Sequence, residues 1–226
     1  MMISPEGYFE EYLKGKTKEQ IMTVIRGLKQ EIGRLKNTME SPDYGVKPIM
    51  HPSEDTRLHW TREYLERAKQ AFAEAGGTYT LSKSEEKVAD FDANMDAICK
   101  ITFSIGGFFD GYRSYVVELS DRLKAYTKLW EDEEPLSLLD GDNEEPFTKD
   151  TFIAALRDLH IGEWLRRYST KRFGYTVCDG TQWELKFEYN NGHKPVMFDG
   201  DNSYPYNFDK FQMLFGIDET EEDEDE

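Results

Sequence analysis

The sequence has few cysteines and no long apolar run. Its two cysteines, Cys99 and Cys178, stand far apart and form no CxxC pair. This spacing argues against a disulfide framework or a structural zinc site, and we interpret both as small buried apolar side chains. No apolar run approaches the roughly 20 residues that a membrane span needs, and the first residues show no basic region followed by an apolar one, so we expect no secretory leader. We therefore expect a cytoplasmic protein without a membrane partner.

The sequence also lacks the short motifs that mark common enzymes and metal sites. HExxH, GxSxG, the P-loop and GxGxxG are all absent, and the four histidines are scattered, at His51, His59, His160 and His193. Pairs of nucleophile and general base depend on a geometry that one sequence does not give. The sequence therefore names no catalytic, cofactor-binding or metal-binding residue and no cofactor, and an enzyme of unknown type is the last alternative.

Positive charge is scarce relative to negative charge. There are 45 acidic and 28 basic residues, which gives a net charge of −17. Residues 1–76 are neutral, residues 77–217 carry 25 acids against 16 bases, and residues 218–226 carry eight acids and no base. Free nucleic acid is a poor partner for such a surface and a basic protein is a better one, because phosphate binding needs cations. We expect residues 218–226 to form a disordered acidic tail, since nothing in them can be buried.

The first part of the chain has helical periodicity. Apolar residues recur every three or four positions through residues 21–39, after a capping box at Thr17, and again through residues 58–75 before the glycine pair 76–77. Two such seams with a short connection predict an antiparallel helical hairpin within residues 1–80. As an alternative, the seam of residues 21–39 would pair with a second copy, which makes the protein a scaffold or homo-oligomer.

The rest of the ordered chain, residues 81–217, changes from helical to alternating periodicity. A helix is predicted from about Ser82. The later segments are predicted as three strands at 100–111, 112–121 and 122–131, a helix at 147–171, a hairpin at 181–200 and a helix at 208–215. The predicted fold class is α+β, with an N-terminal helical hairpin and an antiparallel sheet that contains two hairpin-helix repeats.

The repeats are predicted from two similar stretches, DGDNEEPFTKDTF at residues 140–152 and DGDNSYPYNFDKF at residues 199–211. They agree at eight of thirteen positions, counting one aromatic pair. Each follows a candidate hairpin and precedes a candidate helix, with Thr148 and Asn207 at equivalent N-cap positions. The sequence therefore predicts an internal duplication, about residues 111–161 and 180–217.

The acids of these stretches stand at alternating positions, as oxygen ligands for calcium do. However, glycine stands second instead of sixth, and the twelfth position is Thr151 or Lys210 where an EF-hand needs glutamate. We favour turn chemistry over calcium binding, because Asp-Gly and Asp-Asn suit tight turns. One basic stretch, Arg166 to Arg172, is interpreted as cations at a helix C-terminus and not as a phosphate site.

The densest run of acids within the ordered part is EDEEPLSLLDGDNEE, residues 131–145, which contains eight acids and no base. We predict that these acids form an exposed surface that binds a partner: Glu131, Asp132, Glu133, Glu134, Asp140, Asp142, Glu144 and Glu145. The expected function is an acidic protein-protein interaction module that binds a basic protein. It would inhibit a nucleic-acid-binding protein by imitating the charge of nucleic acid, as anti-restriction and anti-CRISPR inhibitors do, an analogy that rests on charge alone.

Overall fold

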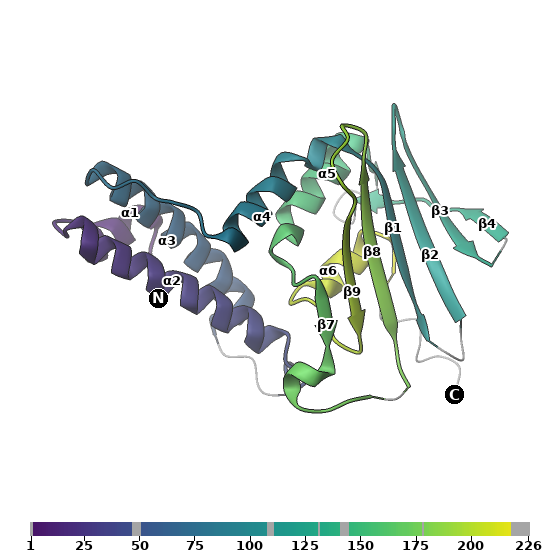
Figure 1. The fold of residues 1–226 in the computed structure, drawn as a ribbon, viewed down its shortest axis with the longest axis horizontal. Helices are drawn as coiled ribbons and strands as arrows, with labels where there is room; N and C mark the ends of the chain where they lie inside the picture. Colours follow the sequence, from purple (N-terminus) through teal and green to yellow (C-terminus); the bar gives the residue numbers. More distant parts are fainter. Residues whose placement is uncertain are drawn as a thin grey trace. The chain divides into compact units, whose positions relative to one another are not determined.

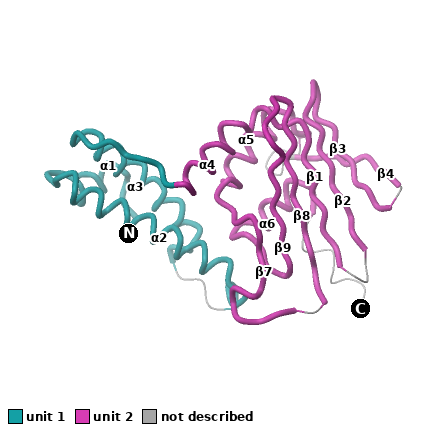
Figure 2. The backbone as a smooth tube through the Cα atoms, viewed as in Figure 1, with its two compact units in different colours: residues 1–82 teal, residues 83–226 magenta. Residues whose placement is uncertain are grey.

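The structure, a computed structural model, shows two compact units in the chain (Figures 1 and 2). It describes residues 2–46, 51–107, 111–130, 132–140, 145–177 and 179–217. Unit 1 comprises residues 1–82 and unit 2 comprises residues 83–226. No helix in the described part of the chain is long and apolar enough to cross a membrane.

Unit 1 is helical. A short helix α1 (Pro5–Tyr8) continues into a π-helical turn η1 (Phe9–Leu13), and two long helices follow, α2 (Lys18–Met39) and α3 (Glu54–Glu74). The capping box predicted at the start of α2 is present: the Thr17 hydroxyl accepts from the Gln20 N–H, and the Gln20 side chain accepts from the Thr17 N–H. The sequence thus sets the first residue of the longest helix.

The two long helices pack along the predicted seams. Ile21 and Ile25 of α2 are buried in one cluster with Leu65, Ala68 and Phe72 of α3. This cluster joins the N-terminal part of α2 to the C-terminal half of α3. An ion pair of 2.8 Å between Glu31 and Arg57 joins the C-terminal half of α2 to the N-terminal part of α3, so the two helices run antiparallel. The apolar residues at 21 and 25 are therefore covered by α3 of the same chain.

Unit 2 is built on a seven-stranded sheet with the order β4-β3-β2-β1-β8-β9-β7. Its strands are β1 (Ile98–Gly107), β2 (Gly111–Leu119), β3 (Leu123–Leu129), β4 (Asp132–Pro135), β7 (Arg167–Ser169), β8 (Gln182–Tyr189) and β9 (Val196–Asp201). Neighbouring strands are antiparallel except β7 and β9, which are parallel. Strands β5 (Leu139–Asp140) and β6 (Glu145–Pro146) form a separate two-stranded pair. Helices and sheet together confirm the α+β class.

Alternating side chains give this sheet one apolar face. In β8, Trp183, Leu185 and Phe187 are buried, whereas the neighbouring Gln182 and Glu184 are exposed. Strands β1 and β9 have the same alternation in matching register, and β2 adds Tyr115 and Val117 to this face, whereas its Val116 is buried on the opposite face. An antiparallel sheet with one covered and one open face is the arrangement that this pattern predicts.

Three helices contribute apolar side chains to the covered face: α4 (Lys83–Ala93), α5 (Lys149–Asp158) and α6 (Phe208–Met213). Phe103 of β1 lies near the centre of this core, with its ring 5.1 Å from that of Phe211 in an edge-to-face arrangement. Phe91 of α4 meets Phe187 of β8 in the same way at 5.2 Å. Such pairs contribute about 0.5–1.5 kcal/mol each beyond burial, so the aromatic residues hold helices and sheet together.

The helix predicted through residue 171 is wrong beyond Asp158. His160 adopts a left-handed conformation with φ of 50°, and two short 3₁₀ turns, η3 (Ile161–Glu163) and η4 (Thr170–Phe173), flank β7. Gly162 packs so closely that an added Cβ would lie 3.1 Å from the Phe91 ring. Because the chain departs from the helical path after Asp158, Ile161 and Trp164 are buried in the core. Arg166 and Arg167 therefore do not lie at a helix C-terminus, whereas Lys171 and Arg172 lie in the 3₁₀ turn η4.

The two DGDN stretches both lead into a helix. Thr148 caps α5 through a reciprocal pair of hydrogen bonds with Thr151, and Asn207 holds the same position before α6. The strands differ, because residues 199–201 belong to the main sheet and Asp140 belongs to β5. Residues 141–144 lie outside the described part of the chain, and the internal duplication stays a prediction.

Candidate functional site

Three of the predicted partner-binding acids lie next to one another on the edge strand β4. Asp132, Glu133 and Glu134 are all exposed, and β4 pairs only with β3 in the described sheet. Because successive side chains of a strand point to opposite faces, Asp132 and Glu134 share one face and Glu133 occupies the other. Both faces of this edge therefore carry negative charge.

These carboxylates have little cationic compensation. Glu133 lies 3.4 Å from the Lys128 ammonium of β3, and both side chains are about half exposed. Exposed pairs of this kind contribute only about 0.2–1 kcal/mol. No ion pair joins Asp132 or Glu134 to a cation in the described ranges of the chain. Two of the three charges are thus available to an external cation.

The other predicted acids are split from this strand. Asp140 is in β5, where its backbone pairs with that of Glu145 in β6, and Glu145 is exposed. Glu131, Asp142 and Glu144 lie outside the described residues. The structure therefore brings together residues 132–134 and places Glu145 on a separate element.

Edge protection offers a structural explanation for the acids of β4. The Leu136 N–H donates to the Ala125 carbonyl, which continues the β3–β4 ladder of hydrogen bonds. In an antiparallel pair, every second residue of a strand bonds to the neighbouring strand. The backbone groups of Glu133 and Pro135 therefore point away from β3. Pro135 has no N–H to donate. Short edge strands with charges and proline resist pairing with another chain. Strand addition is therefore a poor mode of binding here, and side-chain contacts are the better one.

Sequence reasoning placed Trp130 inside a strand and missed its exposure. The residue follows β3, has 82% of its surface exposed and adopts φ of 58°. Leu129 pairs with Asp132, so Trp130 is the first of two residues that connect β3 to β4. The sequence offered no signal for this turn, because two-residue hairpin loops favour glycine, asparagine or aspartate at positive φ and this connection begins with tryptophan.

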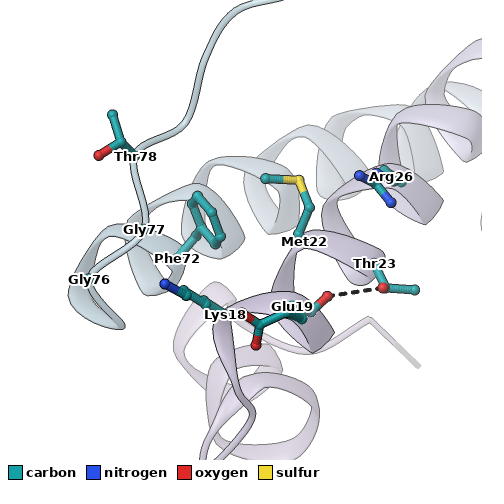
Figure 3. Close-up of a pocket in the computed structure, with 9 residues that line it drawn as sticks. All are labelled: Lys18, Glu19, Met22, Thr23, Arg26, Phe72, Gly76, Gly77 and Thr78. Atoms are coloured by element: carbon teal, nitrogen blue, oxygen red, sulfur yellow. Dashed lines mark hydrogen bonds between the residues drawn. The ribbon is translucent and has the colours of Figure 1, made fainter.

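A pocket of about 480 Å³ lies in unit 1, beside the N-terminal part of α2 and the C-terminal part of α3 (Figure 3). Apolar surface is supplied by Met22 and Phe72, and Lys18 and Arg26 provide cations. Hydrogen bonds from its own backbone and from the Thr17 hydroxyl lower the pKa of Glu19, the acid of this pocket. Glu19 is thus held ionised, which does not suit a general acid at neutral pH.

A group of ionisable side chains in unit 2 surrounds Tyr189. Burial raises the pKa of Tyr189 to about 12, with a smaller opposing effect from Arg166. Burial also lowers the pKa of the Arg166 guanidinium. His193 lies 3.0 Å from an Asp90 oxygen and links the β8–β9 connection to α4. The Tyr189 phenol stays protonated at neutral pH and cannot serve as a base, so this group suits packing more than proton transfer.

Within the ranges that the structure describes, no three His, Cys, Asp or Glu side chains gather closely enough to hold a metal ion. Comparison with known proteins found no matching family model, no matching curated protein and no matching solved structure. The function must therefore be argued from the chain's own surface.

Proposed function

We propose that the chain is an acidic interaction module that binds a basic protein through the carboxylates of β4. The observation that carries the proposal is the exposure of Asp132, Glu133 and Glu134 on one edge strand, with only Glu133 paired to a described cation. Such a surface attracts cations, and binding a cation costs it little free energy because few internal ion pairs must be broken.

The charge distribution supports the class of partner. Residues 77–217 carry nine more acids than bases, and residues 218–226 add eight more acids. A field of this sign repels the phosphates of nucleic acid and speeds the approach of a cationic protein. The proposal includes inhibition of a nucleic-acid-binding protein, whose basic surface would be occupied by carboxylates in place of phosphates.

A cytoplasmic location belongs to the same proposal. Cys99 has a free thiol, which lies 3.4 Å from the Glu188 carbonyl oxygen as a weak donor. A free, partly buried thiol fits a reducing compartment, where disulfides are rare.

Affinity capture tests the proposal. The tagged full chain is incubated with nuclease-treated lysate of its native host at low and at high salt, and the retained proteins are identified by mass spectrometry. We expect one stoichiometric basic protein that is released by high salt, because exposed charge pairs are screened beyond about 8 Å at physiological ionic strength. Retention that is insensitive to salt, or no retained basic protein, would contradict the proposal.

A further inference from the structure

Trp130 combines two unfavourable features that folding does not explain. A bulky residue with φ near 58° is a backbone outlier, and such conformations cost about 1–3 kcal/mol. With 82% of its surface exposed, the indole also gains little from burial. Asparagine or glycine would adopt this backbone conformation more easily and would expose less apolar surface to water. We therefore attribute the tryptophan at this position to a contact with another molecule.

The surroundings of Trp130 hold it in a defined place. A Cβ added to Gly111 would lie 3.9 Å from the indole, so the ring lies near the start of β2. The β2–β3 register, in which Arg113 faces Leu129, places Tyr112 at the same end of the sheet. Tyr112 is itself 47% exposed and donates a hydrogen bond of 2.8 Å to Gln182 of β8. Two exposed aromatic rings therefore lie at this end.

The charges beside Trp130 determine what it can bind. Asp132 lies directly opposite Leu129, and Glu133 and Glu134 follow it on β4. A second copy of the chain would bring the same acids against each other, and an anionic lipid surface would be repelled. A cationic segment of a partner protein is the occupant that suits both the ring and the carboxylates.

We propose that Trp130 anchors an arginine of the bound partner, with the guanidinium stacked on the indole and paired with the Asp132 carboxylate. The inference rests on the proposed function and adds the residue that makes the acidic surface selective. Arginine is favoured over lysine because its planar guanidinium stacks on an aromatic face and pairs with a carboxylate at the same time. Tryptophan is also among the residues that carry most binding energy in interfaces.

Two labelled peptides, nona-arginine and nona-lysine, test this anchor by fluorescence anisotropy with the full chain at low salt. We expect the wild type to bind nona-arginine about threefold to tenfold more tightly than nona-lysine. Trp130→Asn should lose most of this preference while changing the affinity for nona-lysine less than about twofold. Trp130→Phe should keep part of the preference, and Met213→Asn, which alters another exposed apolar side chain, should keep all of it.

The outcomes separate the anchor from the acidic surface. Asparagine tolerates positive φ, so Trp130→Asn should melt at or above the wild-type temperature, which excludes misfolding as the cause of lost binding. An arginine preference that is equal in the wild type and in Trp130→Asn would overturn the role of Trp130 as an anchor. If both peptides still bound in a salt-sensitive way, that result would support the proposed function. Failure of the wild type to bind either peptide would overturn both.

Discussion

Replacing Asn207 by alanine tests how the two helices of the core are joined. Asn207 is buried at the start of α6, where its amide nitrogen donates to the Leu159 carbonyl at 2.7 Å. Its amide oxygen accepts from the Trp164 indole N–H at 2.9 Å. One side chain therefore connects the start of α6 to the end of α5 and to a core tryptophan.

The magnitude follows from what the substitution leaves behind. In Asn207→Ala, the Trp164 N–H loses its partner in a buried region, at about 1–3 kcal/mol, whereas the Leu159 carbonyl loses one bond worth about 1 kcal/mol and keeps the 3.4 Å bond from the Tyr206 hydroxyl. The free energy of unfolding should fall by about 2–4 kcal/mol. Trp164→Phe removes the indole donor and also part of a buried ring, so it should cost at least about 1–3 kcal/mol. The double variant should cost less than the sum, because both changes remove the same bond.

Urea unfolding of the full chain, followed by tryptophan fluorescence and circular dichroism, measures these differences. With a denaturant slope of about 1–3 kcal/mol per molar urea, Asn207→Ala should lower the midpoint of unit 2 by about 1 M or more. Thr148→Ala is the matched control, because it removes an exposed N-cap that is worth about 1 kcal/mol. If Asn207→Ala costs no more than Thr148→Ala, the buried network does not stabilise the fold as argued.

Burial, with the nearby Glu163 charge, raises the pKa of Asp92, so the native state binds more protons than the unfolded state between the ordinary and the raised pKa. The free energy of unfolding of the wild type should therefore rise as pH falls through this window. Asp92→Asn should raise the melting temperature at pH 7, and this difference from the wild type should vanish in acid, where Asp92 is protonated. An unchanged melting temperature at pH 7 would contradict this. Gly77→Ala should destabilise unit 1, since the added Cβ would lie 2.4 Å from the Phe72 ring. Gly27→Ala, in open space within α2, should stabilise it by up to about 1 kcal/mol, and equal effects of the two glycine variants in thermal unfolding would refute the packing argument.

Periodicity predicted the elements whose stability comes from one continuous apolar face. The seam of α2 and the alternation of β1 to β3 each repeat over several residues, so their type and approximate bounds follow from the sequence. The segment after Asp158 did not follow, because its apolar residues continue at helical spacing while Gly162 must approach Phe91 closely. Such a close approach depends on tertiary packing that local spacing does not encode.

The position of a residue was easier to predict than the partner of its side chain. Asn207 stands at the predicted N-cap of α6, yet its side chain makes no cap hydrogen bond and joins Leu159 and Trp164 instead. The acids at 132–134 were predicted as an exposed group and are exposed on β4. Trp130 was missed because its backbone conformation, which marks it as unusual, is not encoded by composition.

The most direct measurement of the central claim is the affinity for the captured basic partner, by isothermal titration at several salt concentrations. The variant Asp132→Asn/Glu133→Gln/Glu134→Gln is compared with a control that removes three scattered exposed acids, Asp121→Asn/Asp158→Asn/Asp179→Asn. We expect the β4 variant to lose about 1–3 kcal/mol of affinity, roughly fivefold to more than a hundredfold, with a shallower salt dependence. The control should stay within about twofold of the wild type. Equal losses in the two variants would show that net charge alone attracts the partner and would contradict a binding surface on β4.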